Sequence, residues 1–258
     1  MRKLTSKWSV FAGGAALATA TLALAASPAM AATGTFTNGN FTQGSYTFNS
    51  MGFVTLYPGG TSYLDGWTVT SGSVDLIGSY WTQPSTDTSG NPYSGYSLDM
   101  NGTPNGTTDT YTPGTISQTF TTVANATYTV QFLLAGNPEC GPSTKTLSVS
   151  ATGTASQSDS FTNSGSTTLS SMGWETEGYT FVAYSGTTTL TFAADAGNTS
   201  NCGAALADVS VTQEASNLGA QCKDDGWQTM YDATGSYFKN QGACVSYYAA
   251  SGFTPIGS

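Results

Sequence analysis

The stretch TYTVQFLLAG, residues 127–136, decides the fold class of this chain because its apolar side chains recur at every second position. One face carries the large side chains of Tyr128, Val130, Phe132 and Leu134. The other face begins with the polar residues Thr127, Thr129 and Gln131. A period of two predicts a β-strand with one buried side, since successive side chains point to opposite faces of a sheet.

The same period appears on the C-terminal side of this stretch. KTLSVSAT (145–152), YTFVAYSG (179–186) and TTLTFAAD (188–195) all place apolar residues at alternate positions. Turn sequences rich in Gly, Asn, Pro and Ser separate these segments, and helix signals are almost absent. We therefore predict an all-β chain, folded as a β-sandwich or a jelly roll, in which two antiparallel sheets pack over one core.

Residues 1–31 have the pattern of a cleaved signal peptide. Three basic residues precede an apolar run, and the small side chains of Ala29 and Ala31 mark a cleavage site. A retained membrane anchor is the alternative, but the run is rich in Ala, Gly and Thr and ends at that cleavage site. We expect a secreted, extracellular protein that does not insert into a membrane.

The charge of the remaining chain restricts its partners. Once residues 1–31 are removed, three lysines stand against 15 acidic residues, which gives a net charge of −12. Nucleic acids and anionic membranes bind proteins through Lys and Arg, so neither is an expected partner, and an acidic polysaccharide would need a bridging cation. The sequence contains no histidine, which excludes catalytic sites built on an imidazole base.

Four cysteines predict two disulfides in an exported chain, because no Cys-x-x-Cys spacing points to a metal site. Three pairings are possible. Pairing Cys140 with Cys202 and Cys222 with Cys244 keeps each bridge within one part of the sequence. On the chain-entropy model each bridge contributes about 3–4 kcal/mol, a value that does not choose among the pairings.

The composition changes near Glu214 and divides the chain after the signal peptide. We expect a β-sandwich over residues 34–213, a linker over 214–221 and a small cysteine-paired unit over 222–258. So short a unit builds little core by itself. Its disulfide would be supported by the aromatic residues Trp227, Tyr231, Phe238 and Tyr247.

Seven stretches resemble a known family in their order and spacing. They are NGNF (38–41), GWTVTSGSVDLIGSYW (66–81), YSLDMNG (96–102), GTISQTF (114–120), TYTVQFLLAGNPECGPSTKTLSV (127–149), GWETEGYTFVA (173–183) and CGAALADVSV (202–211). The chain is similar to the bacterial choice-of-anchor C proteins and to their plant cell-wall relatives, known as domain of unknown function 642. This resemblance implies a secreted, galactose-binding-like jelly roll that associates with cell walls or polysaccharide and has no established catalytic activity.

The resemblance also implies a structural calcium ion where the first turn meets the last strand. Asp208 would supply a carboxylate, and Asn38 and Asn40 would supply neutral oxygens, to an ion that takes about six to eight oxygen ligands. The alternative is that NGNF is only a turn before the first strand and that Asp208 caps a neighbouring loop.

Sugar binding is the function that the aromatic and polar residues favour, since a pyranose ring stacks on an aromatic face while polar groups bind its hydroxyls. The candidates lie within residues 78–102 and are Tyr80, Trp81, Gln83, Tyr93, Tyr96 and Asp99. Alternatives remain for each type: Trp81 as a core residue, Asp99 as a turn cap and the tyrosines as half-buried sheet residues.

We therefore expect a secreted, non-catalytic protein that binds polysaccharide or cell-wall glycan through an exposed aromatic platform. One alternative is a structural or adhesive protein with a contiguous exposed apolar patch. Another is a glycosidase-type enzyme, which needs two facing carboxylates about 5–10 Å apart. The candidates for that pair are Asp75, Asp99, Glu139, Glu175 and Glu177. The glycan and the oligomeric state stay open.

Overall fold

In the computed structural model, the described residues are 34–104, 111–195, 197 and 200–250. They belong to one compact unit. The predicted signal peptide, residues 1–31, and the C-terminal residues 251–258 lie outside the described residues. Within the described part of the chain, no helix has the length and apolar character needed to cross a membrane.

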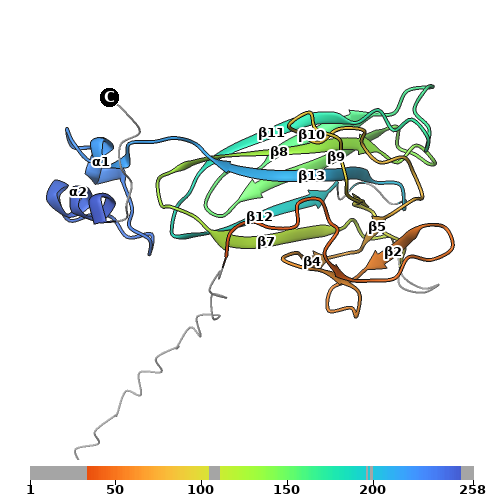
Figure 1. The fold of residues 1–258 in the computed structure, drawn as a ribbon, viewed down its shortest axis with the longest axis horizontal. Coiled ribbons are helices and arrows are strands. Elements are labelled where there is room, and N and C mark those ends of the chain that lie inside the picture. Colours follow the sequence, from red (N-terminus) through yellow and green to blue (C-terminus); the bar gives the residue numbers. More distant parts are fainter. Residues whose placement is uncertain (1–33, 105–110, 196, 198–199, 251–258) are drawn as a thin grey trace, which may run out of the picture. The chain divides into compact units, whose positions relative to one another are not determined.

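Two antiparallel sheets lie face to face and form a jelly-roll β-sandwich (Figure 1). The five-stranded sheet has the order β10 (Gln157–Thr162), β9 (Thr144–Ala151), β12 (Thr187–Ala194), β7 (Thr115–Thr121) and β4 (Thr68–Ser71). The six-stranded sheet has the order β11 (Glu175–Val182), β8 (Thr127–Gly136), β13 (Ala204–Gln213), β6 (Ser97–Asp99), β5 (Val74–Ile77) and β2 (Phe53–Leu56). A short pair consists of β1 (Gly44–Ser45) and β3 (Tyr63–Leu64). The predicted fold class is confirmed.

The alternation of apolar and polar residues that predicted β8 also determines which of its side chains face the core. The core between the sheets contains the four predicted side chains, Tyr128, Val130, Phe132 and Leu134. From Leu133 to Gly136, however, the strand is buried on both faces. The outer face is covered there by a second apolar cluster, in which Trp81 and Met172 join Ala135. Polar groups on this face must therefore find hydrogen-bond partners within the protein.

Both predicted disulfides, Cys140–Cys202 and Cys222–Cys244, are confirmed. The second joins two parts of a short helical segment that follows the sandwich. Its elements are α1 (Leu218–Gln221), the 3-10 helix η1 (Gly226–Thr229) and α2 (Gln241–Ala250). The helix α1 begins inside the segment 214–221 that was predicted as a linker, and Leu218 is fully buried.

The turn NGNF meets the last strand, as the family resemblance implied. The Val209 N–H donates to the carbonyl oxygen of Gly39 over 2.9 Å. A Cβ atom at Gly39 would lie 1.7 Å from the carbonyl oxygen of Val209, so only glycine fits at this position. Strand β13 is bulged here, and Asp208 takes a left-handed φ of +48°. Turn and strand are thus joined through their backbones.

The Asn38 side chain, which is 7% exposed, closes this turn. Its Nδ2 donates to the carbonyl oxygens of Gln43 over 2.8 Å and Asp65 over 2.9 Å. Its Oδ1 accepts the N–H of Gln43 over 3.0 Å, and its backbone oxygen accepts Trp67 Nε1 over 3.0 Å. Two carbonyl oxygens therefore surround one buried nitrogen, which takes the place that a cation would have between such ligands.

The other two predicted calcium ligands are also engaged. Asp208 Oδ2 accepts the N–H of Thr88 over 2.5 Å, so Asp208 caps a neighbouring loop, as the alternative to a calcium ligand predicted. Asn40 Oδ1 accepts the Thr42 hydroxyl over 3.0 Å. Across the described ranges, no group of three or more His, Cys, Asp and Glu could hold a metal. The residues at the junction do not fit the implied calcium ion, because Asn38 presents a donor where an ion needs an acceptor.

We predict that Asn38→Asp lowers the free energy of unfolding by about 2–4 kcal/mol, because a carboxylate would face the carbonyl oxygens of Gln43 and Asp65 without a donor. Calcium should recover much of this loss, since a carboxylate and two carbonyls are ligands of the kind calcium prefers. Urea denaturation with calcium and with chelator measures both effects.

The matched control is Asn38→Ala, which loses the same donors without supplying a carboxylate. Its stability should not respond to calcium, and neither should that of the wild type. A wild-type chain that loses stability in chelator would contradict the role assigned to Asn38.

Candidate functional site

Two carboxylates lie side by side on the outer face of the six-stranded sheet. Asp75 in β5 and Asp99 in β6 are direct cross-strand partners. Val74 and Leu76, on either side of Asp75, belong to the core, so alternation places both carboxylates on the opposite face. Their exposed fractions are only 6% and 2%. Directly opposed side chains have Cβ atoms about 5 Å apart, so two acidic groups share one buried site.

Asp99 is held by three N–H groups. Its Oδ1 accepts the backbone N–H groups of Gly203 over 2.8 Å and Asn101 over 3.0 Å, and its Oδ2 accepts Asn137 Nδ2 over 2.8 Å. Burial disfavours the charged carboxylate and raises the pKa of Asp99 to about 7, against the opposing effect of these hydrogen bonds. The neighbouring charge of Asp75 raises this pKa further.

Asp75 is held mainly by hydroxyl groups. It accepts the hydroxyl of Thr55 over 2.5 Å, the hydroxyl of Thr103 over 3.0 Å and the N–H of Thr103 over 3.2 Å. Burial raises the pKa of Asp75, and these hydrogen bonds oppose the shift. Both carboxylates are therefore satisfied by the protein itself and form a fixed polar floor.

A small pocket of about 40 Å³ lies over this floor. Phe53, Tyr80, Glu139 and Asn201 also line it. The rings of Phe53 and Tyr80 are half-buried and pack edge to face, with centroids 5.5 Å apart. The Tyr80 hydroxyl donates to the Glu139 carboxylate, and this hydrogen bond raises the pKa of Tyr80 to about 12. Glu139 and Asn201 are exposed, so the pocket opens to solvent beside an aromatic pair, a carboxylate and an amide.

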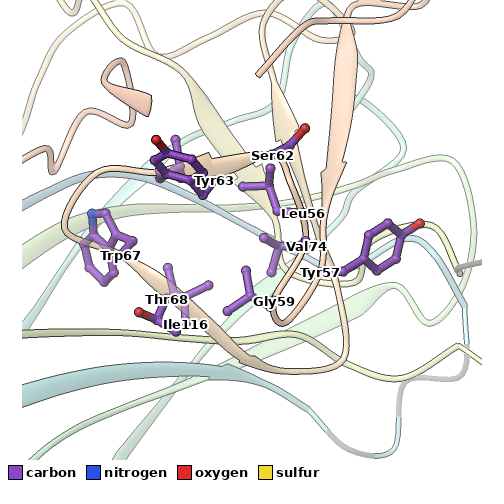
Figure 2. A pocket seen from close by; sticks show the side chains of 12 residues that line it. Leu56, Tyr57, Gly59, Ser62, Tyr63, Trp67, Thr68, Val74 and Ile116 are labelled. Atoms are coloured by element: carbon purple, nitrogen blue, oxygen red, sulfur yellow. The ribbon is translucent and has the colours of Figure 1, made fainter. Parts of the chain in front are cut away.

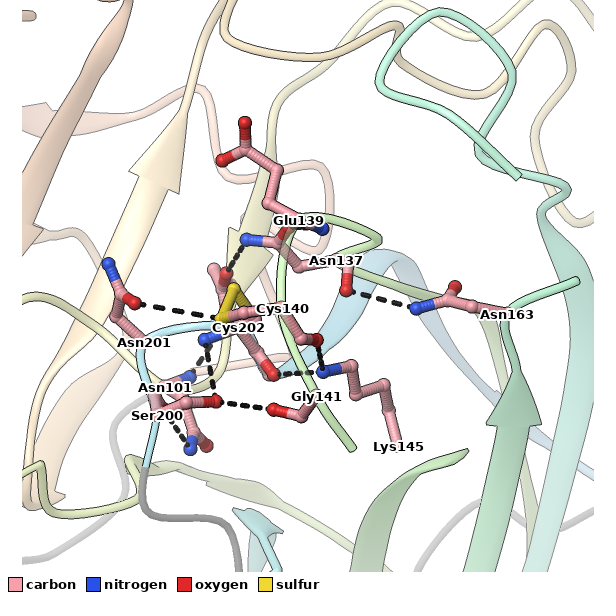
Figure 3. Close-up of a disulfide and its surroundings, with 12 residues drawn as sticks. Asn101, Asn137, Glu139, Cys140, Gly141, Lys145, Asn163, Ser200, Asn201 and Cys202 are labelled. Atoms are coloured by element: carbon pink, nitrogen blue, oxygen red, sulfur yellow. Dashed lines mark hydrogen bonds between the residues drawn. A yellow bond between two sulfur atoms is a disulfide. The ribbon is translucent and has the colours of Figure 1, made fainter. Parts of the chain in front are cut away.

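The Cys140–Cys202 disulfide holds the two loops that supply Glu139 and Asn201 (Figure 3). Beside the bridge, Lys145 is 1% exposed, and its Nζ donates to the carbonyl oxygens of Cys140 over 2.8 Å and Cys202 over 2.5 Å. Burial lowers the pKa of the Lys145 ammonium, which the charge of Asp99 partly offsets. One covalent and two charge-assisted links therefore fix this side of the pocket.

Two of the six predicted ligand-binding residues, Tyr80 and Asp99, line this pocket. Trp81 is only 3% exposed, and its Nε1 donates to the Ser97 hydroxyl over 2.7 Å. This corrects the expectation of an exposed stacking surface at Trp81, whose ring instead fills the apolar cluster on the outer face. Gln83 Nε2 donates to the carbonyl oxygen of Ile77 over 3.0 Å and holds its own loop against β5.

Tyr93 and Tyr96 do not line the pocket and instead lie against the N-terminal turn. The Tyr93 hydroxyl donates to the carbonyl oxygen of Tyr96 over 2.6 Å, and the Tyr96 N–H donates to that of Asn40 over 2.9 Å. Burial raises the pKa of Tyr93, and the charge of Asp208 adds to the shift. The six predicted residues therefore do not form one site. Tyr93 and Tyr96 hold the loop that contains them against the N-terminal turn.

Sequence reasoning missed Phe53, Thr103, Asn137 and Asn201 as pocket residues. A signal was present for Asn201, because it precedes Cys202, just as Glu139 precedes Cys140. The residues beside a predicted bridge between two loops are brought together by it.

A second pocket of about 310 Å³ reaches the core between the sheets (Figure 2). The buried side chains of Leu56, Trp67, Val74 and Ile116 are part of its lining. Tyr57, Ser62, Tyr63 and Thr68 are the hydroxyl-bearing residues of this lining, and the Tyr57 hydroxyl donates to the carbonyl oxygen of Thr103 over 3.0 Å. None of the described residues that line it has a charged or amide side chain, so these residues offer fewer groups to recognise a polar ligand than those of the pocket over Asp75 and Asp99 do.

Solved structures with a partly similar fold have low sequence identity to this chain. TmCBM61 in complex with beta-1,4-galactotriose is 19% identical, with 58% of this chain and 90% of that chain covered and a TM-score of 0.38. CBM35 from Paenibacillus barcinonensis is 22% identical, with 58% and 94% covered and a TM-score of 0.37. A family 35 carbohydrate binding module from Clostridium thermocellum is 16% identical, with 58% and 93% covered and a TM-score of 0.35. No curated protein sequence matches the chain.

A family profile described as "Protein of unknown function (DUF642)" matches residues 34–212. The match starts at the first described residue and ends within β13, so it contains the sandwich and the pocket over Asp75 and Asp99. It confirms the part of the resemblance that concerns this domain, whereas the likeness to choice-of-anchor C proteins stays a prediction. The chain is a member of the DUF642 family.

Proposed function

We infer that this protein binds carbohydrate, without catalysis, at the mouth of the pocket over Asp75 and Asp99. One observation carries the proposal: half-buried aromatic rings and exposed polar groups stand together at the mouth of a preformed pocket. Phe53 and Tyr80 offer the apolar surface, and Glu139 and Asn201 offer an acceptor carboxylate and an amide. A sugar ring presents the same two kinds of surface, since its C–H groups and its hydroxyls lie on different sides.

The charges around the pocket favour a neutral glycan. Asp75, Asp99 and Glu139 all line it, and none of the described residues that line it is basic. An acidic sugar would meet repulsion from these groups, because like charges at short range cost free energy in a poorly solvated site. Hydroxyl groups of a neutral sugar, in contrast, can donate to the exposed Glu139 carboxylate.

The geometry favours binding over hydrolysis. A glycosidase needs two carboxylates on opposite sides of the scissile bond, with room for the sugar between them. Asp75 and Asp99 are adjacent on one sheet face, and both accept hydrogen bonds from the protein. The cavity above them has about 40 Å³, which is room for water but not for a sugar ring, so a glycan bound at the mouth of the pocket would not reach between the two carboxylates.

The proposed place of action is outside the cell, at polysaccharide or a cell wall. The pattern of residues 1–31 supports export. Two disulfides and no free cysteine among the described residues agree with an oxidising compartment.

We predict that Tyr80→Ala and Glu139→Ala each weaken glycan binding about tenfold, because one removes a stacking ring and the other an acceptor for sugar hydroxyls. A pull-down with insoluble polysaccharides, followed by titration with the soluble form of the one that binds, measures the effect.

Tyr111→Ala is the matched control, since Tyr111 is 42% exposed and lies outside this pocket. Its affinity should equal that of the wild type. Equal affinity of Tyr80→Ala and the wild type would remove the pocket as the binding site.

The Asp99 carboxyl also predicts a pH dependence of stability. An unfolded chain releases this proton near pH 4, whereas the folded chain retains it up to pH about 7. The folded state therefore binds more protons between these values, and the free energy of unfolding falls as the pH rises through this range, by on the order of 2–4 kcal/mol. Urea denaturation at pH about 4 and about 7 measures the slope.

Asp99→Asn should flatten this slope, because it removes the titrating group while keeping the side chain's size. Asp224→Asn, which removes an exposed carboxyl on a turn, is the control and should keep the slope. A slope that is the same in Asp99→Asn and the wild type would show that Asp99 titrates alike in both states.

A further inference from the structure

The sequence YDATGSY, residues 231–237, forms a tight hairpin in the C-terminal segment. Asp232 Oδ1 accepts the N–H groups of Thr234 over 2.9 Å and Ser236 over 3.0 Å. The Asp232 N–H donates to the carbonyl oxygen of Ser236 over 2.9 Å, and Gly235 takes the positive φ of +79° that the turn requires. Tyr231 and Tyr237 are consequently bridge partners across the hairpin, with their side chains next to each other.

A third tyrosine, from the sandwich, extends this pair. Tyr184 lies in the turn between β11 and β12. Its ring centroid is 4.6 Å from that of Tyr231, which is 4.7 Å from that of Tyr237. Tyr184 is 43% exposed and Tyr237 is 60% exposed. The three rings therefore make one continuous aromatic surface in contact with solvent, named here the tyrosine platform.

The platform is fixed by hydrogen bonds to the sandwich. Asn125 Nδ2 donates to the Tyr231 carbonyl oxygen over 2.7 Å, and Asn125 Oδ1 accepts the Tyr231 N–H over 3.0 Å. The Gly186 N–H donates to the carbonyl oxygen of Ala233 over 2.9 Å. A Cβ atom at Gly235 would lie 2.8 Å from Tyr184 Cε1, so the hairpin fits closely against this ring. A platform held in this way loses little conformational entropy when a ligand binds.

The relative tilt of the rings indicates the shape of the ligand. Adjacent rings are inclined to each other by 48° and 41°. Rings that are not coplanar do not lie flat on a planar crystalline face, whereas they follow a chain whose sugar rings rotate from one to the next. The ring hydroxyls of Tyr231 and Tyr237 lie 3.2 Å apart at one edge, where they can meet sugar hydroxyls.

The surroundings of the platform favour a neutral ligand. The hairpin between the two tyrosines contributes Asp232, Thr234 and Ser236, and no basic residue. The Asp232 carboxylate is already used by the turn. Tyrosine side chains also anchor protein interfaces. Here the neighbouring side chains carry hydroxyl groups, which match the hydroxyl groups of a carbohydrate.

We propose that Tyr184, Tyr231 and Tyr237 form a second carbohydrate-binding surface, which takes a single twisted chain of a neutral polysaccharide. The proposal rests on the function proposed above, because it assumes the same class of ligand. The platform shares no residue with the pocket over Asp75 and Asp99. Two sites on one chain would also raise the overall affinity for a polymer, since the second contact becomes intramolecular.

The test compares the purified chain with the double variant Tyr184→Ala/Tyr237→Ala. The probes are soluble β-1,4-galactan, β-1,3-glucan and arabinoxylan as neutral chains, crystalline cellulose as a flat surface and polygalacturonate as an acidic chain. Affinity electrophoresis and pull-down should show wild-type binding to at least one soluble neutral chain, weakened at least about tenfold in the double variant. Tyr237→Phe, which keeps the ring, should retain most of the affinity.

Tyr63→Ala and Tyr111→Ala are the matched controls, because these residues are 53% and 42% exposed and lie outside the platform. Both should bind as the wild type does. Equal urea stability of all variants would show that the platform residues do not act through folding.

Three results would overturn the proposal: a double variant that binds as tightly as the wild type, a wild type that prefers crystalline cellulose, or a wild type that binds none of the polysaccharides. Capture of a protein partner without any polysaccharide binding would likewise make the platform a protein-binding surface. The comparison with Tyr80→Ala separates the two sites. If only the platform binds polysaccharide, Tyr80→Ala has the affinity of the wild type and the double variant binds more weakly. If only the pocket binds it, Tyr80→Ala binds more weakly and the double variant has the affinity of the wild type.

Discussion

The link between the loops at Cys140 and Cys202 is the constraint on which the pocket depends. Strand β8 ends at Gly136 and β13 begins at Ala204, so the disulfide ties the ends of two central strands together. Lys145 adds a buried ammonium group that donates to the carbonyl oxygens of both cysteines. A buried charge is tolerated only where it has hydrogen-bond partners, so the burial of this ammonium group depends on the two loops that the bridge joins. The same two loops supply Asn137 and Gly203 to Asp99. The position of Asp99 in the floor of the pocket therefore depends on the link between these two loops.

The fold was predictable because the information for it is local. Alternation of apolar and polar residues specifies a strand with one buried face, and it did so for β8 through Phe132. The same rule failed for the position of Trp81. That residue follows a strand in a polar loop, and only the loop's path over the outer face of the sheet buries its ring. Burial of a loop residue depends on tertiary packing, which a period of two does not encode.

Much of the candidate site depends on register and on loop closure. Asp75 and Asp99 are 24 positions apart in the sequence, and only the pairing of β5 with β6 makes them neighbours. The Asn38 amide likewise acquires its role from the carbonyl oxygens of Gln43 and Asp65, which a motif does not show. The cysteine pairing, in contrast, was predicted from the sequence, because each bridge lies within one part of it. A disulfide also shows directly which two segments lie close together. Residues next to such cysteines are the part of a site that sequence reasoning can reach.

The C-terminal segment is stabilised partly by its own disulfide and partly by contacts with the sandwich. It is too short to build a core, and its buried residues gather around the Cys222–Cys244 bridge together with Leu218, Met230 and Tyr248. Contacts with the sandwich complete it, since the Tyr248 hydroxyl donates to the carbonyl oxygen of Ala124 over 3.0 Å. Further contacts hold the hairpin of residues 231–237 against Tyr184. The Tyr248 hydroxyl donates to the carbonyl oxygen of Tyr231 over 3.0 Å, and the Asn125 side chain binds both the N–H and the carbonyl group of Tyr231. These hydrogen bonds fix Tyr231 beside Tyr184, and this is the physical basis for the proposal that the segment carries binding residues.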